Sequence, residues 1–175
     1  AFTSVDTAIG YQHRWDGGAI AVLAGFHQEN HILSVADPGN RVQGAASGPS
    51  ILIDMWTKPD ASTLMTAYVS ATSVYGGHYS RMFVGRRVSW LKNAFVGPEL
   101  ALMGNDTYWE LRLGAQLNSL YVGPWGASAS FGTSQNQDNH SSLYGSLNLW
   151  RKLDFSKVFR LPRMLRIGNI WRRRF

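Results

Sequence analysis

Hydrophobic and polar residues alternate along much of this chain. In residues 109–117 the apolar side chains occupy odd positions, whereas Glu110 and Arg112 occupy even ones. The alternation recurs in residues 19–29. It recurs again in residues 125–132, where the even positions hold only Gly and Ser. Side chains along a β-strand point alternately to opposite faces, so each segment is predicted to form a strand with one apolar face. Segments of about ten residues with this pattern are typical of transmembrane β-barrel strands.

Turn-forming residues separate the alternating segments. The pairs at 16–17, 76–77, 105–106 and 123–124 consist of Gly, Asn, Asp or Pro, which favour tight hairpin turns. Cutting the chain at these turns predicts nine strands, at residues 3–15, 19–31, 50–57, 63–75, 78–90, 93–103, 107–121, 124–134 and 142–151.

The pattern as a whole predicts an all-β protein, an antiparallel up-and-down transmembrane β-barrel. Segments 34–48 and 134–141 are polar, and an even number of strands separates them, so both are predicted to be surface loops on one side. No apolar stretch reaches the roughly 18 residues of a helical membrane span.

Single-chain bacterial barrels close with an even number of strands, so about ten to twelve are expected in total, the additional ones before Ala1. A tenth strand formed by residues 164–175 is the competing interpretation.

Charge is distributed unevenly along the chain, which carries +6 as a whole. Residues 1–150 contain eight Lys and Arg against ten Asp and Glu, whereas residues 151–175 contain nine against one. Because the strand region is slightly acidic, nucleic acid is not an expected partner. The predicted organisation is a β-barrel over residues 1–151, lacking N-terminal strands, followed by a basic C-terminal tail over residues 152–175.

Charged residues are predicted on the inner wall of the barrel. Acidic and basic side chains are mixed there, which favours an interior joined by salt bridges. Glu99 is expected to form an ion pair with Arg112 or Arg87 on a neighbouring strand. The predicted inner charges are Asp6, Arg14, Glu29, Asp54, Arg81, Arg87, Glu99, Glu110 and Arg112.

Two residues depart from the pattern. Arg86 falls on the outer face, which indicates either an interfacial position or a register shifted by one residue. Pro98 lies within a predicted strand, where its missing N–H indicates a bulge or a strand start near Gly97.

Three segments carry a resemblance to a known family: DPGNRVQG at 37–44, VGPELALMGNDTYWELRLGAQL at 96–117 and SSLYGSLNL at 141–149. They resemble the cellulose biosynthesis protein BcsS family of bacterial outer-membrane β-barrels. The resemblance implies a location in the outer membrane and an accessory or conduit role in export of an exopolysaccharide, cellulose. Members of the family usually carry additional N-terminal strands, and the basic tail has no counterpart among them.

Inward aromatic residues are candidates for contact with a glucan polymer, because flat rings can stack on the apolar faces of glucose units. The alternative is an aromatic girdle at the membrane interfaces, which any barrel possesses. These residues are Trp56, Tyr68, Tyr108, Tyr144 and Trp150.

No catalytic residue, cofactor or metal is predicted, and the chain is interpreted as a non-enzyme. It has no cysteine, and His27 and His31 would lie about 13 Å apart along a strand, too far to share a metal ion. Pairing His78 with Ser80, or His140 with Ser141, would give a barrel hydrolase, but no G-x-S-x-G elbow or orienting acid accompanies them. A soluble or periplasmic barrel that binds a small apolar ligand is the chief alternative, although inward Arg and Glu count against it.

The tail is predicted to dock outside the membrane. Basic residues recur between apolar ones, which suits a short amphipathic helix interrupted by Pro162 and Gly168. Such a segment fits outer-membrane lipid head groups, an acidic envelope protein or the barrel interior. An assembly signal ending in Phe175 and a disordered extension are the alternatives. The docking residues are Lys157, Arg160, Arg163, Arg166, Arg172, Arg173 and Arg174.

Overall fold

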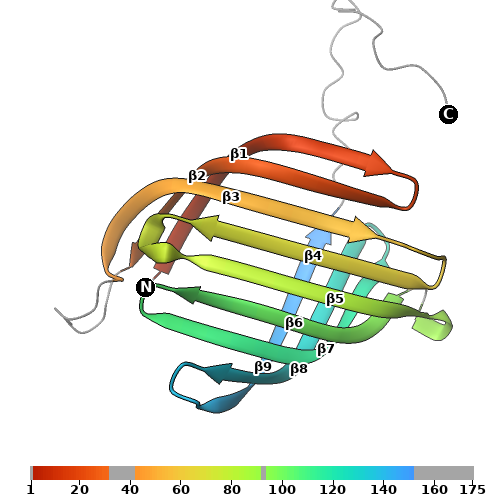
Figure 1. Cartoon of the computed structure of the whole chain (residues 1–175). Helices are drawn as coiled ribbons and strands as arrows, with labels where there is room; N and C mark the ends of the chain where they lie inside the picture. Colours follow the sequence, from red (N-terminus) through yellow and green to blue (C-terminus); the bar gives the residue numbers. More distant parts are fainter. Residues whose placement is uncertain (1, 32–41, 92–93, 152–175) are drawn as a thin grey trace, which may run out of the picture.

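Nine β-strands form one antiparallel sheet in the computed structural model, which describes residues 2–31, 42–91 and 94–151 (Figure 1). Each strand pairs with its neighbours along the chain. No helix in these ranges is long and apolar enough to cross a membrane. The elements are β1 (Phe2–Trp15), β2 (Gly18–His31), β3 (Gly44–Thr57), β4 (Thr63–Thr72), η1 (Val74–Gly76), β5 (His78–Val88), η2 (Ser89–Leu91), β6 (Ala94–Asn105), β7 (Tyr108–Val122), β8 (Trp125–Asn136) and β9 (Ser141–Arg151).

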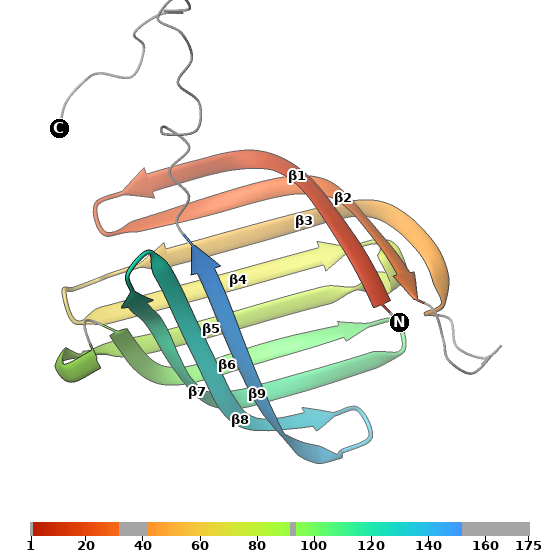
Figure 2. The same ribbon diagram turned by 180° about the vertical axis from the view of Figure 1, so that it is seen from behind.

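The sheet curls back on itself, so that β9 lies behind β4–β6 in Figure 1 and in front of them in Figure 2. Strands β1 and β9 form its two edges, and no pairing joins them within the described ranges. Because successive strands alternate in direction, β1 and β9 run the same way, and an antiparallel closure would require a further strand between them. The predicted all-β, up-and-down meander is confirmed, whereas the sheet of the described residues is open. The additional strands expected before Ala1 stay a prediction. The competing tenth strand, at residues 164–175, lies outside the described residues.

The predicted strand boundaries agree with the structure to within a few residues, except at the start of β3. This strand begins at Gly44, inside the predicted loop 34–48. Its first residues pair with the end of β2, from His31↔Gly44 to Phe26↔Pro49. The backbone groups of β2 need hydrogen-bond partners over the full length of that strand, and this requirement outweighs the turn-like composition of the segment.

The two faces of the sheet differ in composition. Residues directly opposite each other on paired strands share a face, so each row of pairs can be followed across the sheet. The face that points into the curl carries a contact between strands that are not neighbours, from Tyr144 on β9 to Glu99 on β6. The other face exposes apolar side chains such as Ile9 and Leu113. The inner face also holds the small hydrophobic core, which consists of Leu64, Phe83 and Phe95.

Pro98 lies inside β6 rather than at its start. The β5–β6 register is the same on both sides of it, with Phe83↔Glu99 before and Arg86↔Val96 after. Pro98 itself is paired with Ala115 of β7. The expected bulge or strand start is therefore wrong: the proline is accommodated by a local interruption of the ladder towards β5, where its missing N–H would have donated.

A β-bulge occurs instead in β7, where the register with β8 shifts between Leu117 and Leu120. Ser119 adopts a φ of 61°, a left-handed conformation that lets one extra residue enter the strand. The shift reverses the faces beyond it. Tyr121 is opposite Gly126, on the inner face, although the simple alternation would have turned it outward.

Arg86 points outward, as the alternation predicts, and lies at the turn between β3 and β4. It pairs with Thr63 in the ladder, and its Nη1 donates to the hydroxyl oxygens of Ser62 and Thr63. The same nitrogen lies 3.6 Å from a carboxylate oxygen of Asp60. The register is therefore not shifted, and the guanidinium is directed to polar groups at the end of the strand.

Asp60 organises this turn. One carboxylate oxygen accepts hydrogen bonds from the backbone N–H and the hydroxyl of Ser62, and the other accepts from the Thr63 hydroxyl. These hydrogen bonds, with a smaller contribution from Arg86, lower the pKa of Asp60 from 3.8 to about 2. The carboxylate thus stays ionised throughout the neutral and mildly acidic range.

Acid titration of Asp60 is expected to have its midpoint near pH 2. Because the folded-state pKa is depressed, the contribution of Asp60 to stability is present above the ordinary carboxyl pKa and is lost as the pH falls towards 2. Carbon-13 NMR of the Asp60 carboxyl group measures the midpoint. Ser62→Ala should raise it more than Arg86→Gln does, since Ser62 makes the largest contribution. A midpoint near 4 in the unaltered protein would contradict this assignment.

Candidate functional site

The inner face of the curled sheet, called the concave face below, is the candidate functional surface. All nine predicted inner charges lie on it. One row of ladder pairs runs Asp54↔Tyr68↔Arg81↔Ala101↔Arg112. The other predicted charges lie in other rows on the same face. Among them, Arg14 is opposite Ala19, Asp6 opposite His27, Arg87 opposite Phe95 and Glu99 opposite Gly114.

Glu110 and Arg112 form an ion pair on β7. The Nε of Arg112 lies 2.8 Å from the Oε1 of Glu110, and the Tyr108 hydroxyl donates to the Oε2 of Glu110 at 2.7 Å. The Arg112 guanidinium also lies 5.2 Å from the centre of the Tyr144 ring on β9. Two of the predicted aromatic residues, Tyr108 and Tyr144, thus contact the charged pair Glu110 and Arg112. The pair lies near the start of β7.

Glu99 is buried, with 4% of its surface exposed, and its carboxylate is bound by hydroxyl groups. Ser130 Oγ donates to one oxygen at 2.9 Å, and the Tyr144 hydroxyl donates to the other at 3.1 Å. The expected ion pair with Arg112 or Arg87 is therefore wrong. Arg112 is taken by Glu110, and the Arg87 guanidinium lies over the Phe95 ring, 5.8 Å from its centre.

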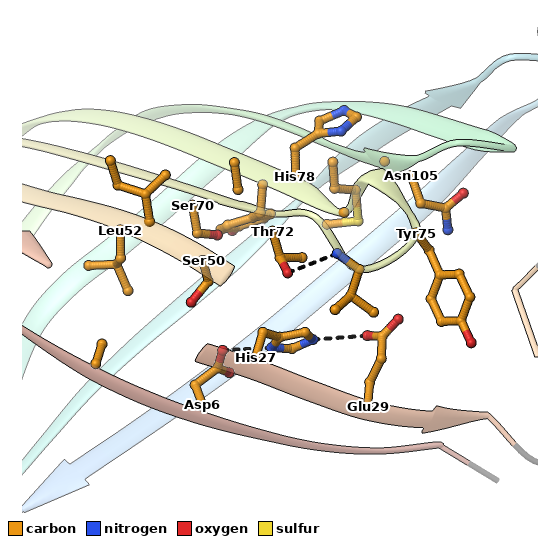
Figure 3. Close-up of a pocket in the computed structure, with 18 of the residues that line it drawn as sticks. Asp6, His27, Glu29, Ser50, Leu52, Ser70, Thr72, Tyr75, His78 and Asn105 are labelled. Atoms are coloured by element: carbon orange, nitrogen blue, oxygen red, sulfur yellow. Dashed lines mark hydrogen bonds and ion pairs between the residues drawn. The ribbon is translucent and has the colours of Figure 1, made fainter. Parts of the chain in front are cut away.

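A histidine and carboxylate cluster lies at the same end of the sheet as Tyr108, but on β1 and β2 (Figure 3). His27 Nδ1 is 2.6 Å from Asp6, and His27 Nε2 is 3.0 Å from Glu29. Glu29 also lies 3.3 Å from His31 and so bridges the two histidines. Carboxylate oxygens only accept hydrogen bonds, so an imidazolium that donates from both nitrogens fits between Asp6 and Glu29. The sequence signal for this cluster is the alternation of polar residues at the end of β2; Asp6 and Glu29 are among the predicted inner charges, whereas the two histidines are considered only as metal ligands.

The histidine cluster borders a hollow of about 610 Å³. Figure 3 shows Ser50, Ser70 and Thr72 across from His27, with Tyr75 at one side. The walls thus mix hydroxyl groups with carboxylates and imidazoles. His78, considered above as a partner for Ser80, has its Nδ1 at 3.1 Å from the Gly76 carbonyl oxygen.

A second hollow, of about 500 Å³, lies towards the end of the sheet where β3 ends and β8 begins. Three of the predicted aromatic residues line it: Trp56, Tyr68 and Trp150. Tyr121 is the fourth ring, which sequence reasoning missed because the β7 bulge turns it inward. The adjacent Asn118 and Ser119, two polar residues late in a strand, were the available signal for that bulge. We call this cavity the aromatic hollow.

The docking residues of the basic tail lie outside the described residues. Their docking role therefore stays a prediction.

The family model for the cellulose biosynthesis protein BcsS matches residues 2–153, a range that contains all nine strands. The chain belongs to the BcsS family. The resemblance carried by the three sequence segments is thus confirmed, and membership implies involvement in cellulose biosynthesis. No curated protein and no solved structure matches the chain.

Tyr144→Phe is expected to lower the free energy of unfolding by about 1.5 kcal/mol, the lower end of the range for a hydrogen bond to a charged group. The change removes the donor to buried Glu99 but keeps the ring beside Arg112. Urea titration of the protein in detergent micelles measures the difference. Tyr11→Phe, at an outward position that is 72% exposed, is the matched control and should have little effect. Equal effects of the two substitutions would contradict the role assigned to Tyr144.

Proposed function

We propose that this protein is an outer-membrane β-barrel that acts as an accessory or conduit component in the biosynthesis and export of cellulose. The observation that carries the proposal is the composition of the convex face, combined with membership of the BcsS family. The location, the transmembrane state and the conduit role are the parts of this proposal that go beyond family membership.

The outward, convex face is apolar along the middle of the strands. Several apolar side chains there are more than 60% exposed: Val5, Ile9, Phe131 and Leu147. Among the outward positions of the described strands, Lys, Arg, Asp and Glu occur only near strand ends, at Arg86 and at Arg151, which is the partner of Trp125. A soluble monomer rarely exposes so large a contiguous apolar surface, whereas hydrocarbon requires one. An Arg or Lys at the bilayer midplane would cost about 2 to 4 kcal/mol.

Tryptophans near the strand ends support the same location. Trp15 ends β1, Trp90 lies in η2 after β5, and Trp125 begins β8, so all three lie at one end of the meander. They are 41%, 80% and 50% exposed. Trp109, at the opposite end, is the second residue of β7. Amphipathic indole rings favour the two interfaces of a bilayer, which matches this distribution.

The concave face favours a hydrated interior. It carries carboxylates and guanidinium groups from β1 to β7, in contrast to a soluble ligand-binding barrel, which is apolar inside and polar outside. The proposed role is non-catalytic: His27 contacts two carboxylates and His78 a backbone carbonyl, rather than a serine hydroxyl. The partners proposed are outer-membrane lipid, a glucan polymer and, through the tail, envelope or cellulose-secretion proteins.

Site-specific labelling tests the membrane orientation. With cysteine introduced singly, Leu113→Cys and Phe131→Cys should react with a lipid-phase probe, and Arg112→Cys and Ser130→Cys with a small aqueous probe. The expectation follows from the alternation of exposed and inward positions on β7 and β8. The sequence contains no cysteine, so the background is low. The reverse labelling pattern would exclude this orientation.

Deletion of the gene in a cellulose-producing host tests the role in export. Extracellular cellulose should fall severalfold and return when the unaltered gene is restored. Density-gradient fractionation should recover the protein with outer-membrane markers. Unchanged cellulose would refute the role in export, and recovery in the soluble fraction would refute the location.

A further inference from the structure

The aromatic hollow brings together rings from widely separated strands. Trp56 comes from β3, Tyr68 from β4, Tyr121 from β7 and Trp150 from β9. Strands β4 and β9 do not pair with each other, so the curl of the sheet is what places these rings around one space. A volume of about 500 Å³ lies within the range of small-ligand sites in proteins.

The rings remain accessible although they point into the curl. Trp56 is 41% exposed, Tyr121 is 53% exposed and Trp150 is 36% exposed. Large inward aromatic side chains are normally covered by packing, because they contribute most when their apolar faces leave water. Uncovered rings around a hollow therefore provide apolar area that a bound molecule can bury.

The orientation of two of the rings is set by their neighbours. Trp150 packs over Gly126, where a methyl group would lie 2.2 Å from the indole nitrogen. Tyr121 meets Trp150 edge to face, with ring centres 6.2 Å apart and planes at 89°. Preorganised rings lose little conformational entropy on binding, which favours recognition of a rigid, flat ligand.

Polar groups border the same rings. Asp54, Tyr68 and Arg81 follow one another in a single row of ladder pairs, and Thr66 and Asn118 also line the hollow. A carboxylate, a guanidinium, an amide and hydroxyl groups together provide both hydrogen-bond donors and acceptors. A pyranose unit presents two apolar C–H faces and a rim of hydroxyl groups. Flat rings with polar groups at their edges are complementary to both features.

We propose that the aromatic hollow is a binding subsite for a short stretch of β-1,4-linked glucan. The inference rests on the proposed role in cellulose export, which it deepens by naming the residues that contact the polymer. In a β-1,4-linked glucan the glycosidic bonds, like the ring hydroxyl groups, are equatorial, so the chain is extended and successive units present flat faces. An α-1,4-linked chain curves and does not present consecutive flat faces to rings fixed on different strands. The hollow is therefore expected to select for the β-linkage.

Calorimetric titration of the purified full chain in detergent micelles tests the proposal. Cellohexaose should bind, and maltohexaose, which has the same units in α-linkage, should not. Trp150→Leu and Trp56→Leu, which keep an apolar side chain but remove the flat ring, should each weaken cellohexaose binding about tenfold, or by about 1.4 kcal/mol. Trp109→Leu, an outward tryptophan at the opposite end, is the matched control and should leave binding unchanged.

Heat-modifiable mobility on a gel establishes that each variant is folded before titration. Trp150→Phe and Trp56→Phe keep a ring and should recover most of the affinity, which separates stacking from simple loss of packing. The proposal is overturned if the folded protein binds neither sugar, binds both equally, or binds cellohexaose with unchanged affinity in the leucine variants. None of these results bears on the outer-membrane location or on the cellulose deficit of the deletion strain, so the two proposals can fail separately.

Discussion

The register of the antiparallel ladder is the constraint on which the rest of this structure depends. Directly opposed residues share a face, so one row carries Asp54, Arg81 and Arg112 together across several strands. A slip of one residue between two strands would put Leu113 in the place of Arg112 and reverse every later position. The difference in composition between the two faces is therefore a consequence of many backbone hydrogen bonds that agree on one register.

The two local exceptions to this regularity differ in their effect on the concave face. The bulge in β7 inserts one residue at positive φ and turns Tyr121 towards Trp150. The interruption of the ladder at Pro98 has no such effect, because the register is the same on both sides of it. The difference is that a bulge changes the count of residues along a strand, whereas a missing N–H only removes a hydrogen bond.

Curling of the sheet creates contacts that the ladder alone does not provide. Glu99 and Tyr144 lie on β6 and β9, with two strands between them, yet their side chains are hydrogen bonded. In contrast, Asp6 and His27 are direct ladder partners on β1 and β2. The concave face thus combines clusters made within neighbouring strands and clusters made across the interior, and both hollows are bordered by residues from strands that do not pair.

Sequence by itself determined the strands, their antiparallel order and the face to which most side chains point. Alternation with a period of two carries this information locally, as residues 109–117 show. It also determined that Arg112 and Glu110 share a face, because they are two residues apart on one strand. The family, and with it the link to cellulose biosynthesis, was likewise carried by the sequence segments themselves.

Only the tertiary structure decided which groups meet. Glu99 was expected to pair with an arginine, but the curl brings the Tyr144 hydroxyl to it and leaves Arg112 with Glu110. The start of β3 and the inward position of Tyr121 were also decided by pairing with neighbouring strands rather than by local composition. The physical reason is that alternation specifies a direction for each side chain, whereas contacts depend on register, bulges and the curvature of the whole sheet, to which every strand contributes.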